Sequence, residues 1–142
     1  MDRYRVRVGQ KVKLAEWAAN DKEAFSGTKE EAKTELAELA QKLAELQDIL
    51  YAQHKHKILV VLQAMDTGGK DGVIRSVFGK IDPQGVRVAN FKVPTAIELD
   101  HDYLWRVHQQ VPGKGELVIF NRSHYEDLLV VRVHELAPEK VW

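Results

Sequence analysis

A glycine-rich segment that directly follows an apolar run constrains the fold of this 142-residue chain more than any other feature. The apolar run is Ile58-Leu59-Val60-Val61-Leu62, which is typical of a strand buried on both faces of a parallel sheet. We expect it to be the first, central strand. Residues 63–72, with the sequence QAMDTGGKDG, come next and lead into a helical pattern. A glycine-rich loop between a strand and a helix predicts phosphate binding.

The residue types in this loop suit an anionic ligand. Glycines let the backbone approach an anion closely, and successive N–H groups can point toward it. The N-terminus of the following helix adds a partial positive charge. Lys70 supplies an ammonium group that can neutralise a phosphoryl group during its transfer. The predicted phosphate contacts in the loop are Thr67, Gly68, Gly69, Lys70, Asp71 and Gly72.

The loop departs from the common pattern G-x-x-x-x-G-K-[ST]. Ala64 stands at the first glycine position, and Asp71 stands where a hydroxyl would bind magnesium. Asp66 is the most unusual residue, because a carboxylate among phosphate-binding amides repels the substrate unless a divalent cation lies between them. We interpret Asp66 as a magnesium ligand or a general base. The alternative is a glycine-rich turn in which Asp66 caps the next helix.

The rest of the chain alternates between strand and helix patterns. Further strands are predicted at 86–91 and 117–120, and helices at 72–78 and 97–108. This alternation predicts an α/β fold with a parallel, three-layer sheet. We divide the chain into an N-terminal arm, residues 1–27, and a core, residues 28–142.

A capping box is predicted at the start of the core, where Glu31 follows Thr28 at the required spacing. The helix that it opens should run to about Tyr51. An apolar stripe along this helix is expected to pack against its own domain or against a sister subunit, and its spacing also suits a coiled-coil seam. We expect a homo-oligomer. The stripe consists of Leu36, Leu39, Leu43, Leu46 and Leu50.

Polar residues gather after the third predicted strand. Arg122 is suited to bind phosphate oxygens, and Asp127 or Glu126 to hold a metal. Because the carboxyl ends of parallel strands meet at one edge, this cluster and the Lys70 loop should face each other. Lys92, after the intermediate strand, and Arg75, one turn into the loop's helix, are further candidate phosphate contacts. Residues at helical spacing from 98 to 106 line the site or belong to the core, with Asp102 and Arg106 as an i,i+4 pair in the second case.

Composition narrows the class of protein without naming a partner. The 21 basic residues balance the 21 acidic ones, and no nucleic-acid partner is indicated, although residues 1–13 carry five basic residues and one acidic residue. The absence of cysteine excludes disulfides and thiolate metal sites and suits the cytoplasm. No apolar run approaches the roughly 20 residues of a membrane-spanning helix, so no membrane partner is expected.

Three segments together resemble the polyphosphate kinase 2 family. They are residues 62–72 (LQAMDTGGKDG), 91–95 (FKVPT) and 120–127 (FNRSHYED), and their order and spacing agree with the family as well. The resemblance covers about residues 30–142. It implies a P-loop kinase fold similar to thymidylate kinase and magnesium-dependent phosphoryl transfer between inorganic polyphosphate and adenine or guanine nucleotides.

The resemblance also assigns roles to residues. It implies that Asp66, Lys70 and Arg122 are catalytic and that Asp66 and Asp127 hold Mg²⁺. Many family members carry Asp where this chain has Asn121, which lacks the charge. The 120–127 segment is similar to the subgroup that accepts both AMP and ADP. Family members continue past the length of this chain into a further strand and a helical lid, so we expect an incomplete core that lacks its carboxyl-terminal part.

Two other functions fit the same residues. The first is a conventional ATP-dependent nucleotide kinase, which Asp66 and Asp71 argue against. The second is a non-catalytic phosphate-binding or assembly fragment, which the length of the chain favours.

Overall fold

The computed structural model describes residues 4–18, 20–21 and 23–135. Part of the basic arm, Asp2 and Arg3, and the last segment, 136–142, lie outside the described residues. The chain forms two compact units, residues 1–37 and residues 38–142, and the boundary falls inside helix α1 (Lys29–Gln53). The division into an arm and a core at residue 27 stays a prediction.

The first unit contains a short 3₁₀ helix, η2 (Leu14–Glu16), and the start of α1. The predicted capping box is confirmed. The Thr28 N–H donates to Glu31 Oε2 (2.6 Å), and the Glu31 N–H donates to Thr28 Oγ1 (3.2 Å). The hydrogen bond from the Thr28 N–H is the largest cause that lowers the pKa of the Glu31 carboxyl, because it stabilises the charged form. Local sequence therefore determines where α1 begins.

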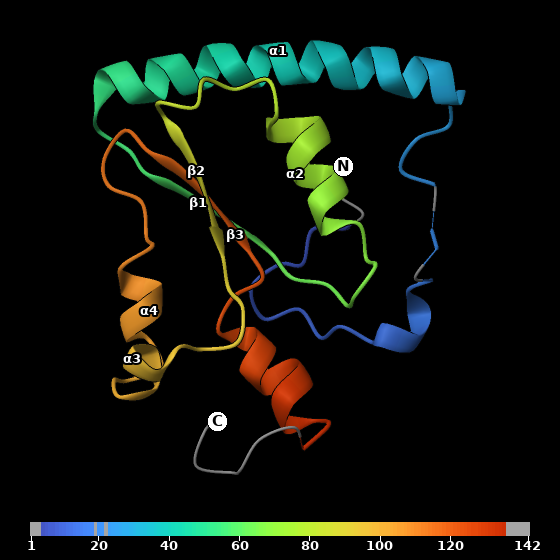
Figure 1. The fold of residues 1–142 in the computed structure, drawn as a ribbon. Coiled ribbons are helices and arrows are strands. Elements are labelled where there is room, and N and C mark those ends of the chain that lie inside the picture. The colour runs from blue at the N-terminus through green and yellow to red at the C-terminus, as the bar shows by residue number, and fades with distance from the viewer. Residues whose placement is uncertain (1–3, 19, 22, 136–142) are drawn as a thin grey trace. The chain divides into compact units, whose positions relative to one another are not determined.

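The second unit is built on a parallel sheet of β1 (Ile58–Leu62), β2 (Val86–Asn90) and β3 (Leu117–Asn121) in the order β1-β3-β2 (Figure 1). The register pairs Leu62 with Asn121 and Asn90 with Asn121. The last residues of all three strands therefore lie level at one edge of the sheet, and the segments that follow them begin side by side.

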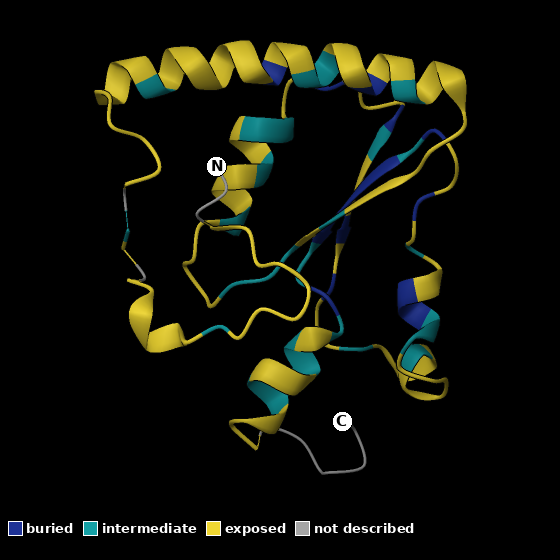
Figure 2. Cartoon of the chain, turned by 180° about the vertical axis from the view of Figure 1, so that it is seen from behind, coloured by how far each residue is buried: buried dark blue, intermediate teal, exposed yellow. Residues whose placement is uncertain are grey.

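The prediction that β1 is the central strand is wrong for the sheet described here. β3 is central, and its residues Val118, Ile119 and Phe120 are almost fully buried (Figure 2). β1 has one neighbouring strand and exposes Ile58 and Val61. An apolar run shows that a strand can be buried on both faces, but it does not show how many strands flank it.

Helices lie on both faces of the sheet, as predicted for three layers (Figure 1). Successive strand residues point to opposite faces. On one face, Val118 and Phe120 form the core with Val107 of α4 (Trp105–His108), and the Phe91 and Phe120 rings lie 4.7 Å apart. The opposite face of β3 contacts α2 (Lys70–Phe78). The α/β fold class is thus confirmed.

The helix predicted at 97–108 is two short helices, α3 (Ala96–Leu99) and α4. A second capping box, formed by Thr95 and Glu98, starts α3. The Asp102 carboxylate accepts a hydrogen bond from the Leu104 N–H (2.9 Å) and forms a turn between the helices. Aspartate side chains compete in this way with helical hydrogen bonds, which is why the periodic pattern did not produce one helix.

The carboxyl-terminal part of α1, which belongs to the second unit, fully buries Ala40 and Gln47, and Leu43 and Leu50 of the predicted leucine stripe are half-buried. Gln47 lies so close to Gly85 that a Cβ on this glycine would be 1.7 Å from Nε2 of Gln47. Leu39 and Leu46 remain exposed. Packing of the stripe against a sister subunit stays a prediction. Within the described part of the chain, no helix combines the length and apolar character needed to cross a bilayer.

Phe120 should be essential for the stability of the second unit. Its side chain is 1% exposed, so Phe120→Ala leaves a cavity between β3 and α4. We expect a loss of about 3–5 kcal/mol in the free energy of unfolding. The matched control, Val93→Ala, removes a side chain that is 89% exposed and should change stability by less than about 0.5 kcal/mol. Urea unfolding followed by circular dichroism measures both, and equal effects would contradict this account of the core.

Candidate functional site

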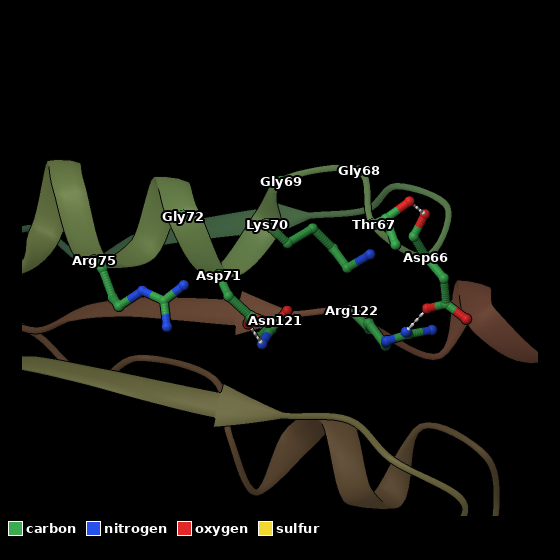
Figure 3. Close-up of a pocket in the computed structure, with 10 residues that line it drawn as sticks. All are labelled: Asp66, Thr67, Gly68, Gly69, Lys70, Asp71, Gly72, Arg75, Asn121 and Arg122. Atoms are coloured by element: carbon green, nitrogen blue, oxygen red, sulfur yellow. Dashed lines mark hydrogen bonds and ion pairs between the residues drawn. The ribbon is translucent and has the colours of Figure 1, made fainter.

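A pocket of about 390 Å³ opens where β1 and β3 end (Figure 3). Its walls come from the loop after β1, the first turns of α2 and the end of β3. The lining residues are Asp66, Thr67, Gly68, Gly69, Lys70, Asp71, Gly72, Arg75, Asn121 and Arg122. A volume of this size suits a small-molecule ligand.

Glycines shape the loop that forms one wall. Gly69 adopts φ 84°, a left-handed conformation that favours glycine, and α2 begins at the next residue. A Cβ on Gly68 would lie 2.8 Å from the Ala64 Cβ and 2.9 Å from the Met65 carbonyl oxygen. The loop therefore closes tightly at Gly68, and the N-terminus of α2 faces the pocket.

The Lys70 side chain folds back over the loop. Its Nζ donates to the Ala64 carbonyl oxygen (2.7 Å) and to the Met65 carbonyl oxygen (2.9 Å). An ammonium group has three N–H donors, so these two bonds leave one for a ligand. Lys70 is thus held at the pocket by the loop itself.

Arg122 is shared by two carboxylates. Nη2 donates to Asp66 of the loop, and Nη1 donates to Glu126, one turn further along its own segment. The hydrogen bond that Arg122 donates to Asp66 and the negative charge of Glu126 raise the pKa of Arg122, so its guanidinium stays protonated. Arg122 also adopts φ 68°, which is uncommon for a residue with a side chain. Such strained backbone is often found at functional sites.

Asn121 connects the end of β3 with the first turn of α2 and with the end of β2. Its Nδ2 donates to Asp71 Oδ1 (2.9 Å) and to Asn90 Oδ1 (3.0 Å). Its own Oδ1 is buried and accepts no hydrogen bond from the described residues. A buried oxygen of this kind at the wall of a polar pocket is suited to accept a bond from a ligand or to bind a cation.

The structure brings together most of the predicted site residues. Lys70 and Arg122 lie on facing elements at one end of the pocket, and Arg75 lies at the other (Figure 3). The exposed Arg75 side chain makes no ion pair with any described residue. Three cations therefore line one pocket, as a polyanionic ligand requires.

Two predicted residues lie elsewhere. Asp127 and Lys92 are absent from the pocket lining. The buried Arg106 binds both segments, since it donates to the Lys92 carbonyl oxygen (2.9 Å) and to Asp127 Oδ2 (3.3 Å). Burial raises the pKa of the Asp127 carboxyl, although the positive charge of Arg106 opposes this shift. The predicted pairing of Arg106 with Asp102 is wrong, because Asp102 forms the turn before α4.

Sequence reasoning missed Gln63 as a functional candidate. Its Nε2 donates to Glu126 Oε2 (2.6 Å), and its Oε1 accepts from the Ser123 hydroxyl (3.2 Å). Its position in the sequence could have indicated a role. Gln63 is the first residue after β1 and therefore lies level with the residue after β3.

Comparison with known proteins shows the family. Residues 26–142 match the family model described as Polyphosphate kinase 2. The chain belongs to the polyphosphate kinase 2 family.

Individual relatives agree with this assignment. The chain is 60% identical over 142 residues to the AMP/ADP-polyphosphate phosphotransferase of Meiothermus ruber, covering 100% of this chain and 53% of the relative. It is 46% identical over 131 residues to the ADP-polyphosphate phosphotransferase of Rhodopseudomonas palustris, covering 92% and 45%. The chain thus spans about half the length of these curated relatives.

Solved structures of the family share the fold. Polyphosphate kinase 2 from Arthrobacter aurescens TC1 superposes with a TM-score of 0.85 at 43% identity, over 94% of this chain and 49% of that chain. A polyphosphate kinase 2 structure from Pseudomonas aeruginosa PA01 superposes with a TM-score of 0.73 at 29% identity, over 84% and 26%. The P-loop kinase fold expected from the sequence is therefore confirmed.

Two glycines at the candidate site should respond in opposite ways to replacement by alanine. Gly68→Ala forces the loop apart and should lower the free energy of unfolding by about 1–3 kcal/mol. Gly72→Ala places a Cβ in open space on α2 and should raise it by about 0.5–1 kcal/mol, because alanine favours helices. Urea unfolding of both variants tests the loop geometry, which a stable Gly68→Ala protein would contradict.

Proposed function

We propose that this protein transfers phosphoryl groups between inorganic polyphosphate and the adenine nucleotides AMP and ADP, with Mg²⁺ as cofactor. The main support is the pocket in which Lys70, Arg122 and Asp66 converge on a glycine-rich loop. The names of the relatives, AMP/ADP-polyphosphate and ADP-polyphosphate phosphotransferases, support the same substrates.

The residues act by positioning and by neutralising charge, which is the main requirement for phosphoryl transfer. The loop N–H groups and the remaining N–H of Lys70 bind the transferred phosphoryl group. Arg122 and Arg75 bind neighbouring phosphates at the two ends of the pocket. The loop N–H groups and Lys70 are in place before the ligand arrives, so they can stabilise negative charge that develops during transfer.

The pocket suits Mg²⁺, which prefers oxygen ligands and is often held by one or two carboxylates with substrate phosphates and water. Asp66 and Asp71 provide the carboxylates, and the buried Asn121 Oδ1 provides an uncharged oxygen. No group of three or more potential metal-binding His, Cys, Asp or Glu residues occurs among the described residues. When bound, Mg²⁺ would neutralise these phosphate oxygens. A metal role for Asp127 rests on the sequence alone.

Polyphosphate-dependent transfer should require Lys70. With ADP, polyphosphate and Mg²⁺, Lys70→Ala should lower ATP formation by roughly 10²–10³-fold, the usual effect of removing one group that stabilises transition-state charge. The control Lys114→Ala alters an exposed lysine before β3, at the opposite edge of the sheet. A luciferase assay measures ATP, and full turnover by Lys70→Ala would disprove the assignment.

A change of phosphoryl donor and a binding measurement separate the two alternative functions. A conventional nucleotide kinase would transfer from ATP to AMP without polyphosphate. A non-catalytic phosphate-binding module would bind tripolyphosphate in calorimetry and form no ATP, even at high protein concentration. Asp66 in the loop and Asp71 at its end favour the polyphosphate-dependent reaction.

Asp66 should determine the Mg²⁺ requirement. Asp66→Asn keeps the side-chain shape but removes the charge. Even the loss of a residue that only supports a metal ligand weakens metal affinity by roughly 10- to 100-fold. We expect the Mg²⁺ concentration for half-maximal ATP formation to rise at least about tenfold. Asp48→Asn, on the exposed surface of α1, is the control. An unchanged Mg²⁺ requirement in Asp66→Asn would exclude Asp66 as a ligand.

Further proposals concern partners and location. We propose that guanine nucleotides are also accepted, since the phosphate pocket described here makes no use of the base.

Leu39, Leu46 and Ile49 on the exposed face of α1 support a homo-oligomer, which light scattering can test. The cysteine-free sequence suits the cytoplasm.

A further inference from the structure

The segment after β1 and the segment after β3 are joined by side chains behind the pocket wall. Ser123, which is 1% exposed, donates to Gln63 Oε1 (3.2 Å), and Gln63 Nε2 donates to Glu126 Oε2 (2.6 Å). The other oxygen of Glu126, Oε1, accepts from Arg122 Nη1. A continuous path of hydrogen bonds therefore runs from a buried hydroxyl to the pocket guanidinium.

The chemistry of the partners determines the orientation of the Gln63 amide. A carboxylate only accepts hydrogen bonds, so the amide NH₂ must face Glu126. The amide oxygen then faces the Ser123 hydroxyl, which can donate. Gln63 thus satisfies both neighbours at once, and the Glu126 carboxylate is fixed by partners on both of its oxygens.

The two carboxylates on Arg122 differ in how firmly they are held. The Asp66 side chain is 83% exposed and belongs to the loop that binds the ligand. The Glu126 side chain is 17% exposed and is bound by Gln63. Asp66 can therefore leave Arg122 when it takes another partner, whereas Glu126 remains.

We propose that Gln63 is a positioning residue. Gln63 holds the Glu126 carboxylate in place. The Glu126 carboxylate in turn keeps the Arg122 guanidinium directed into the pocket after the bond between Asp66 and Arg122 has broken. The phosphate contact of Arg122 rests on the proposed function, but its restraint by Gln63 does not. Of the residues on this hydrogen-bonded path, Arg122 touches the ligand, and Gln63 acts through Glu126.

The test compares the mobility of the Arg122 side chain in variants of the full chain. Nitrogen-15 relaxation at Arg122 Nε, assigned from the signal lost in Arg122→Lys, reports its order parameter. We expect an order parameter that approaches the value of rigid backbone, about 0.85, in the wild type and one below about 0.6 in Gln63→Leu. The control Gln41→Leu changes an exposed glutamine on α1 and should leave Arg122 ordered. A mobile Arg122 in the wild type, or an ordered one in Gln63→Leu, overturns the proposal.

An exchange of the two groups gives a second, isosteric test. Gln63→Glu places two carboxylates against each other and should free Arg122. The double variant Gln63→Glu/Glu126→Gln restores one amide and one carboxylate, with an oxygen still available to Arg122 and another to Ser123. Recovery of order in the double variant supports the proposal, because a general packing defect would persist. Failure to recover overturns it.

Binding of tripolyphosphate with Mg²⁺, measured by calorimetry, separates this proposal from the proposed function. We expect Gln63→Leu and Gln63→Glu to weaken binding by up to roughly 100-fold, as misplaced groups do, and the double variant to recover it. A wild type that binds no tripolyphosphate refutes the phosphate-binding function, while the order parameters still decide the role of Gln63. If Arg122 becomes mobile in these single variants but their affinity for tripolyphosphate is unchanged, Gln63 has no role in ligand binding.

Discussion

The parallel pairing of β1 with β3 is the interaction on which the candidate site depends. Because Leu62 lies level with Asn121, the loop after β1 and the segment after β3 begin at the same edge of the sheet. Lys70 and Arg122 are 52 positions apart in the chain and share a pocket only through this register. The almost fully buried residues of β3 hold the pairing in place.

Local patterns predicted much of this arrangement. The apolar run gave β1 its correct bounds, and Thr28 with Glu31 marked the start of α1, because both signals are contained in a few neighbouring residues. The convergence of Lys70 and Arg122 followed from the general geometry of parallel sheets. These features can be predicted without knowing which distant residues each side chain contacts.

The features that the sequence did not predict depend on such distant partners. The pattern at 98–106 suggested that Arg106 pairs with Asp102, but α4 brings Arg106 to Asp127, 21 positions further on. The same contact places Asp127 outside the pocket lining. Gln63 was missed for a related reason, since its partners Ser123 and Glu126 are 60 and 63 positions away. An isolated glutamine gives no sign of such partners.

The charges of the pocket follow from the same contacts. Lys70, Arg75 and Arg122 supply three cations, while Asp66 and Asp71 offset two of them. The pocket therefore keeps an excess of positive charge that attracts a polyanion, and both carboxylates have partners among the described residues. Asn121 is such a partner for Asp71, and Arg122 is one for Asp66. The affinity of the pocket for phosphate therefore depends on what replaces Arg122 beside Asp66, because that exchange decides whether the Arg122 guanidinium is free to bind the ligand together with Arg75.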